Sequence, residues 1–292
     1  MMRSGASRDV NHVNHDVNHA ISPQTCFVRG THLKKGRCSW LSPATGAVRE
    51  LHYGRIILDA GAAGVCFSNA GQETALICLN GRAQVKACGS AFSMGQYDSL
   101  YVPRDCEIEV AAEQGCDLAE ISAPVEHFYP LQFVPYAGVK ADPGLHFKTG
   151  STSFERTVNV LIGKNVNAGR ILAGVTFSQP GNWTSWPPHE HAAMLEEAYV
   201  YISMPEPSWG MQFVYTDPKA PELVQVVREG DCVVIPAGYH PNVAAPGGSI
   251  NFLWIMAAHR EGDDRQFGVV NVQPEYAGGA SGLESGREAA GK

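Results

Sequence analysis

The 292-residue sequence has no run of 18 consecutive apolar residues, and its N-terminus lacks the basic segment and apolar stretch of a secretory signal. A membrane-spanning helix is therefore not expected, and the sequence predicts a cytoplasmic protein. Acidic residues outnumber basic ones, 29 to 22, so nucleic acid or an anionic lipid surface is not expected as a partner. Only 17% of the residues are charged and 44% are hydrophobic, which is enough apolar material for a core.

The eight cysteines include no CxxC pair and are irregularly spaced, so neither a disulfide framework nor a cysteine-based metal site is expected. Most of them lie among apolar residues, and this predicts buried free thiols in a reducing compartment. The cysteines concerned are Cys66, Cys78, Cys88, Cys106, Cys116 and Cys232.

No stretch keeps the 3.6-residue apolar period of an amphipathic helix for long. Short apolar runs are instead separated by Gly, Pro, Asn and Asp, as in "ALICLNGRAQV", where Asn80-Gly81 predicts a hairpin turn. Such runs predict an all-β protein with few and short helices. A tail is expected at residues 1–25, with His12, His15 and His19 in a near-repeat, and a second, Gly/Ser/Ala-rich tail at residues 277–292.

Two parts of the sequence resemble each other. "RIILDAG", from Arg55, is similar to "RILAGVTFSQPG", from Arg170, and "GQYDSLYVPRDCEIEV" is similar to "EGDCVVIPAGYHPNV". A repeat of this length predicts two similar β-barrels in tandem. We place the N-terminal barrel at residues 26–135 and the C-terminal barrel at residues 136–276.

The stretch "WPPHEHAAMLEEAYVY" predicts a metal site. His189 and His191 alternate along the chain, so a strand aims both imidazoles to one side. The returning strand places Glu196 on a small, aliphatic face that suits a barrel interior, and this predicts that Glu197 points outward. His240 follows a Pro-Ala-Gly turn at the end of a later strand. Three imidazoles and one carboxylate leave positions open on a divalent ion, as a catalytic site requires.

The spacing of these residues resembles the motifs of the cupin fold. "PGNWTSWPPHEHAAMLEEAYVYI", "QFVYTD", "EGDCVVIPAGYHP" and "LWIMA" are similar, in this order, to segments of the bicupin isomerase family of 5-deoxy-glucuronate and 5-keto-4-deoxyuronate isomerases. The resemblance implies a tandem cupin whose C-terminal barrel carries the metal ligands His189, His191, Glu196 and His240. In the N-terminal half "NAGQETALICL" stands in place of the two histidines, so that barrel is expected to bind no metal in this way.

The resemblance also implies an activity. We expect isomerisation of 5-deoxy-D-glucuronate to 5-dehydro-2-deoxy-D-gluconate in inositol catabolism, with one divalent ion (Zn, Mn or Fe) and a small sugar acid as the substrate. A homo-oligomer is possible in such a family. Three alternatives stay open: isomerisation of another sugar acid such as 5-keto-4-deoxyuronate, a metal-dependent dioxygenase, and a bicupin that binds a sugar without catalysis.

Several further side chains are candidates for the chemistry. A carboxylate near the metal can shuttle a proton, for which Glu197 and Glu190 are available, and Tyr199 or Tyr239 can donate to a developing oxyanion. Gln212, within "QFVYTD", is expected to line the pocket. The substrate carboxylate requires a cation, and the candidates are Arg156, Lys164 and Arg170.

Overall fold

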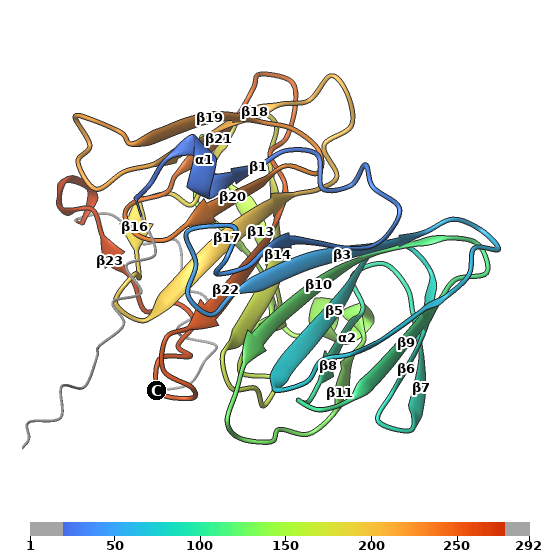
Figure 1. Ribbon diagram of the computed structural model, residues 1–292. Helices are drawn as coiled ribbons and strands as arrows, with labels where there is room; N and C mark the ends of the chain where they lie inside the picture. Colours follow the sequence, from blue (N-terminus) through green and yellow to red (C-terminus); the bar gives the residue numbers. More distant parts are fainter. Residues whose placement is uncertain (1–19, 278–292) are drawn as a thin grey trace, which may run out of the picture.

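The computed structural model describes residues 20–277 (Figure 1). This part of the chain is nearly all β, with only the short helices α1 (Pro23–Cys26) and α2 (Tyr136–Ala141) and the 3-10 turn η1 (Pro274–Tyr276). None of these helices is long and apolar enough to span a membrane. The predicted all-β bicupin fold with few short helices is confirmed.

Strands from the first half of the chain form two sheets that face each other at the lower right of Figure 1. The six-stranded sheet has the order β11-β8-β5-β10-β3-β2 and the smaller sheet has the order β4-β9-β6-β7. The strands are β2 (Gly36–Leu41), β3 (His52–Leu58), β4 (Val65–Ser68), β5 (Gln72–Gly81), β6 (Ala83–Ala87), β7 (Ser90–Met94), β8 (Ser99–Val102), β9 (Glu107–Ala111), β10 (Cys116–Pro124) and β11 (Gln132–Val134).

The second half repeats this arrangement, and β1 from the beginning of the chain joins the edge of its large sheet. A seven-stranded sheet has the order β1-β20-β17-β22-β14-β13-β12, a four-stranded sheet has the order β15-β21-β18-β19, and β16 pairs with β23. The strands are β1 (Phe27–Val28), β12 (His146–Thr149), β13 (Arg156–Ile162), β14 (Ile171–Ser178), β15 (Trp183–Thr184), β16 (His189–Glu190), β17 (Leu195–Tyr201), β18 (Gly210–Val214), β19 (Leu223–Val227), β20 (Cys232–Ile235), β21 (Asn242–Ala244), β22 (Phe252–Ala258) and β23 (Asn271–Val272).

The two large sheets correspond strand by strand. Reading β8-β5-β10-β3-β2 beside β20-β17-β22-β14-β13 gives the same order, with antiparallel pairing throughout. The sequence repeat related the corresponding strands, β3 to β14 and β8 to β20. The two halves are therefore copies of one topology.

The cores of the two halves differ. Between the N-terminal sheets a closed apolar cluster, including Ile56, Leu76, Leu100 and Leu118, fills the space. A second, larger cluster lies in the C-terminal half and continues into the contact between the halves. The space between the two N-terminal sheets is thus filled by an apolar cluster of their own side chains.

Four local expectations are corrected. Residues 1–25 were assigned to a tail, but residues 23–25 lie in helix α1, which Ser22 caps. Residues 1–19, with His12, His15 and His19, and residues 278–292 of the second predicted tail lie outside the described part of the chain. β1, assigned to the N-terminal barrel, pairs with β20 of the C-terminal sheet. Asn80-Gly81 makes no hairpin, because β5 and β6 belong to different sheets. Cys88 and Cys106 form a disulfide rather than free thiols.

Gly81 shows why the chain changes sheets at that point. Its φ of +74° lies in the left-handed region, and a Cβ atom there would come within 2.3 Å of the carbonyl oxygen of Gly115. Only glycine fits such a position without displacing the backbone. The Asn-Gly pair therefore marks a corner between two sheets, which the local sequence does not distinguish from a hairpin.

Two buried glutamates join the halves by the same device. Glu196, on β17, accepts hydrogen bonds from the backbone N–H groups of residues 49–51, just before β3, at 2.5–2.7 Å. Glu73, on the corresponding strand β5, accepts three from residues 169–171, at the start of β14, at 2.6–2.7 Å. Each half thus supplies a carboxylate to the backbone of the other. We call this pair the reciprocal carboxylate contacts.

The reciprocal carboxylate contacts predict a stability effect. In Glu196→Gln and in Glu73→Gln an amide replaces the charge, and its NH₂ group faces backbone donors, so we expect each variant to lose about 2–3 kcal/mol of unfolding free energy. Urea denaturation measures this. Glu109→Gln is the matched control, because Glu109 is exposed and paired only with Lys86, and it should change stability by less than about 0.5 kcal/mol. An equal loss of unfolding free energy in all three variants would contradict the role of Glu196 and Glu73 in joining the halves.

Candidate metal centre and pocket

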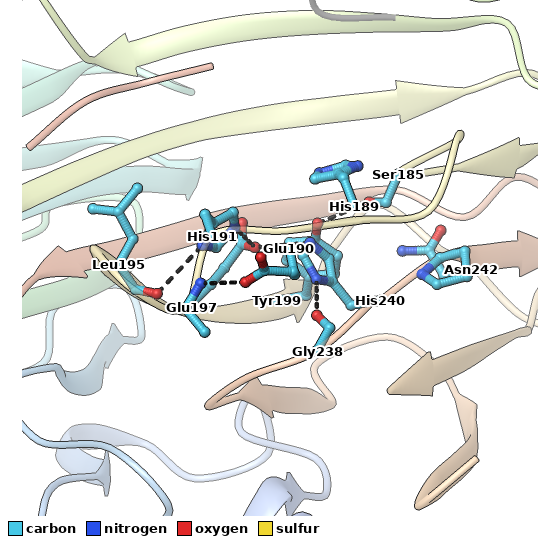
Figure 2. A network of polar contacts seen from close by, with 12 residues as sticks. Ser185, His189, Glu190, His191, Leu195, Glu197, Tyr199, Gly238, His240 and Asn242 are labelled. Carbon is cyan, nitrogen blue, oxygen red and sulfur yellow. Dashed lines mark hydrogen bonds and ion pairs between the residues drawn. The ribbon is translucent and has the colours of Figure 1, made fainter. Parts of the chain in front are cut away.

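Three buried side chains of the C-terminal barrel point toward one another (Figure 2). The carboxylate oxygen Oε2 of Glu197 lies 3.0 Å from Nε2 of His191 and 3.3 Å from Nε2 of His240. One ligand atom from each of the three residues falls within 4.8 Å of the others. The ring of His189 lies beside them, with its centroid 4.8 Å from that of His240. The sequence predicted that the three histidines would meet, and the fold brings them together.

Backbone carbonyls fix the histidine rings. Nδ1 of His189 lies 2.9 Å from the carbonyl oxygen of Pro187, and Nδ1 of His240 lies 3.0 Å from that of Gly238. A carbonyl only accepts, so both Nδ1 atoms carry the proton and both Nε2 atoms present a lone pair. Histidine ligands of metals are commonly held in this way, with the second ring nitrogen bonded to a backbone oxygen.

The Nε2 atom of His240 tests whether a cation fits. It is buried and has no hydrogen-bond partner, although a carboxylate oxygen of Glu197 lies 3.3 Å away. Two acceptors that face each other without a shared proton are unfavourable unless a positive group satisfies both. A divalent ion does so, and imidazole nitrogens with one carboxylate oxygen suit Zn, Mn or Fe. The residues present therefore fit a metal ion.

Burial controls the protonation of the cluster. It lowers the pKa of His189 to about 4 and the pKa of His240 well below its ordinary value, and neighbouring histidines lower the latter further. Both imidazoles are thus neutral at pH 7, as ligation requires. Burial raises the pKa of Glu197. Burial alone would lower the pKa of His191, but the hydrogen bond and charge of Glu197 outweigh it and raise that pKa.

The predicted facing of the two glutamates is reversed in the structure. Glu197 faces the histidines, whereas Glu196 faces the other half of the molecule and binds backbone there. Strand alternation held, but the aliphatic face with Ala198 and Val200 packs in the core cluster shared by both halves. The barrel interior is lined by the face that carries Tyr199. Both faces of β17 are buried, so the period of two could not tell which one is the interior.

A pocket opens beside the histidines. Its polar wall includes Arg156, Ser185 and Tyr199, together with His189, His191 and Glu197. Its apolar wall includes Trp254, Met256 and the segment 267–270, which β23 holds in place by pairing with β16. Arg156 is 3% exposed, and its Nη1 donates to the carbonyl oxygen of Phe154. Burial raises the pKa of Tyr199 well above its ordinary value, so the phenol stays protonated.

Other candidates from the sequence lie outside this pocket. Gln212 does not line the pocket. Its Nε2 donates to the carbonyl oxygen of His240, 2.9 Å away, and so helps to fix the backbone of that histidine. The guanidinium of Arg170 is bound to the carbonyl oxygens of Pro124, Ala258 and His259. The carboxylate of Glu190 accepts from the backbone N–H of Ala192 and from Asn271.

Lys164 and Tyr239 are also absent from the lining of the pocket. Tyr239 forms a backbone bridge to Tyr215, and their rings are 5.7 Å apart. Of the predicted catalytic and substrate-binding residues, only Glu197, Tyr199 and Arg156 line the pocket.

Two parts of the pocket escaped the sequence analysis. Ser185 lies in the quoted stretch "GNWTSWPPH", four residues before His189, and a small polar residue between Trp183 and Trp186 was the available signal. The segment 267–270 follows the last strand of the barrel and carries no motif. Only the return of the chain over the pocket, through β23, brings it there.

Comparisons with known proteins agree with this architecture. The family model described as the KduI/IolB family matches residues 29–273. A 5-deoxy-glucuronate isomerase from Geobacillus thermodenitrificans is 31% identical over 203 residues, 64% of this chain and 72% of the relative. One from Geobacillus kaustophilus is 32% identical, with the same shares covered.

Solved structures show the same fold. An IolB-like protein from Salmonella typhimurium has a TM-score of 0.75 and 25% identity, covering 87% of this chain and 97% of that one. A variant of oxalate decarboxylase from Bacillus subtilis has a TM-score of 0.60 at 14% identity, covering 88% of this chain and 81% of that one. At this identity the second likeness concerns the fold alone.

The opposite facing of the two glutamates predicts different effects on metal content. Glu197→Gln removes the charge of the candidate ligand, so the affinity for the metal should fall about 10-fold or more. The purified variant should therefore contain little metal. Glu196→Gln is the matched control on the adjacent position and should retain the metal while losing stability. Elemental analysis with thermal unfolding separates the two effects. Loss of metal from the Glu196 variant with retention in the Glu197 variant would contradict the geometry.

Proposed function

The chain belongs to the KduI/IolB family, and we propose that it converts 5-deoxy-D-glucuronate to 5-dehydro-2-deoxy-D-gluconate with the help of one divalent metal ion. The family and its named relatives make it a sugar-acid isomerase with a small-molecule substrate. The particular sugar acid, the metal, the role in inositol catabolism and a cytoplasmic location are parts of the proposal. One observation carries it: His191 and Glu197, two members of the cluster that His240 completes, line the same pocket as the buried Arg156.

The reaction requires charge stabilisation. An aldose–ketose isomerisation removes a proton from the carbon beside a carbonyl group and returns one to the neighbouring carbon, through an enediol. His189, His191, Glu197 and His240 would hold a divalent ion, which would supply Lewis-acid stabilisation for the negative charge that develops on the substrate oxygens. In this arrangement Glu197 would be a metal ligand rather than the base.

We assign Arg156 as the residue that binds the substrate carboxylate. It is the one arginine or lysine among the described residues that line the pocket. A guanidinium presents several N–H donors in a plane that matches both oxygens of a carboxylate. Arg156 and the histidine cluster line one polar wall, so the carboxylate end and the reacting end of one small molecule can be held together.

The apolar wall serves the same chemistry. Trp254 and Met256 come from β22, where they pair with Tyr199 and Glu197 of β17, and Phe267 stacks on Trp254 with 5.2 Å between ring centroids. An apolar wall excludes water and so strengthens the electrostatic interactions in the pocket. Exclusion of water also reduces unwanted proton transfer from solvent to the enediol.

We expect the purified protein to form 5-dehydro-2-deoxy-D-gluconate from 5-deoxy-D-glucuronate, followed by NMR in D₂O. Chelator treatment should abolish turnover, and re-addition of the metal found by elemental analysis should restore it. Turnover of 5-keto-4-deoxyuronate alone would place the enzyme on the other substrate of its family. Oxygen consumption without isomerisation would contradict the proposal.

Within the same assay, Arg156→Met tests the carboxylate contact. Loss of a buried charge-assisted hydrogen bond costs about 1.5–3 kcal/mol, so kcat/KM should fall about 10- to 100-fold. The matched substrate is 5-deoxy-D-glucose, which carries a hydroxymethyl group in place of the carboxylate. Its turnover should be much lower in the unaltered enzyme and nearly insensitive to the substitution. An equal fall for both substrates would mean that Arg156 only supports the fold.

A further inference from the structure

Ser185 occupies a constrained position in the wall of the pocket. Its φ of +49° lies in the left-handed region, which is unfavourable for a residue other than glycine. The chain on both sides is fixed, since β15 pairs with β21 just before it and β16 pairs with β23 just after it. The side chain is 7% exposed. Such conformations persist where the surrounding structure imposes them, and they concentrate at functional sites.

The hydroxyl of Ser185 meets a second hydroxyl within the pocket. Its Oγ lies 2.7 Å from the phenolic oxygen of Tyr199, and either atom can be the donor. The Tyr199 ring is held firmly, stacked on Phe252 at 4.2 Å and edge-on to His240 at 5.8 Å between centroids. Figure 2 shows Ser185 on the side of the cluster near His189 and Tyr199. A fixed phenol thus defines where the serine hydroxyl lies.

The polar groups that line the pocket differ in whether they can donate or accept a hydrogen bond. An arginine only donates and a carboxylate only accepts, and the Nδ1 atoms of His189 and His240 are committed to backbone carbonyls. During an aldose–ketose isomerisation, one substrate oxygen changes from a carbonyl, which accepts, to a hydroxyl, which also donates. A partner for that oxygen must be able to reverse its direction of donation. A serine hydroxyl does so by rotating about its Cβ–Oγ bond.

We propose that Ser185 is the hydrogen-bond partner of the substrate oxygen that changes between carbonyl and hydroxyl, and that Tyr199 is its positioning residue. The inference rests on the proposed isomerase function. With a carbonyl bound, Tyr199 donates to Ser185 and Ser185 donates to the substrate. With a hydroxyl bound, the substrate donates to Ser185 and Ser185 donates to Tyr199. Both side chains stay neutral throughout.

The chain contains a matched pair for comparison. The phenolic oxygen of Tyr97 lies 3.0 Å from Oγ of Ser203, and Ser203 has a φ of +53°. Neither residue lines the pocket. Ser203→Ala therefore removes the same chemical group from the same backbone conformation away from the substrate.

The test measures kcat and KM on 5-deoxy-D-glucuronate for Ser185→Gly, Tyr199→Phe, the double variant and Ser203→Ala. Glycine accepts the left-handed conformation, so Ser185→Gly removes the hydroxyl without straining the fold. We expect kcat to fall about 100-fold in Ser185→Gly, since one lost donor to a developing oxyanion has this effect, with KM changed by less than about threefold. Metal content should be unchanged, and Ser203→Ala should keep full activity.

The double variant separates positioning from simple packing. If Tyr199 acts through Ser185, Tyr199→Phe alone should lower kcat about 10-fold but have almost no effect in the Ser185→Gly background. A kcat within twofold of the original in Ser185→Gly would overturn the inference, as would fully additive effects. Absence of turnover in the unaltered enzyme would overturn the proposed function itself, and this inference with it.

Discussion

Glu196 and Glu197 put two buried carboxylates on opposite faces of one strand, and the rest of the molecule supplies what each requires. A buried charge is stable only when it is paired or richly hydrogen-bonded. Three backbone N–H groups from the other half surround Glu196, and the histidine cluster surrounds Glu197. One strand, β17, therefore contacts the other half through one face and contributes Glu197 to the proposed metal centre through the other.

The two halves differ at the position of the proposed metal centre. Glu73 repeats the structural role of Glu196 on the corresponding strand, but the next residue is Thr74, where the other half has Glu197. An apolar cluster fills the space between the N-terminal sheets, and Thr74 hydrogen-bonds to Ser122. Among residues 20–277 the cluster of potential metal ligands lies in the other barrel, so we assign the N-terminal barrel a supporting role for the position of β17.

Much of this was accessible from the sequence. Turn residues and short apolar runs predicted the β architecture, the repeat related β3 to β14 and β8 to β20, and the alternation of His189 and His191 predicted their convergence. What the sequence could not supply depends on which neighbour covers each face. Both faces of β17 are buried, so pattern alone assigned the wrong glutamate to the interior. The local sequence also does not show which strands pair, so Asn80-Gly81 was predicted to be a hairpin turn rather than a corner between two sheets. The return of segment 267–270 over the pocket was not predicted, because it depends on the pairing of β23 with β16.

We propose that a divalent ion binds where His191, Glu197 and His240 converge, with His189 beside them. A crystal structure of the protein loaded with the metal found by elemental analysis, using anomalous scattering at that metal's absorption edge, tests this most directly. We predict one strong peak about 2.0–2.3 Å from the Nε2 atoms of the histidines and from a carboxylate oxygen of Glu197. A peak bound by Glu196, a peak in the N-terminal barrel, or no peak at the cluster would contradict it.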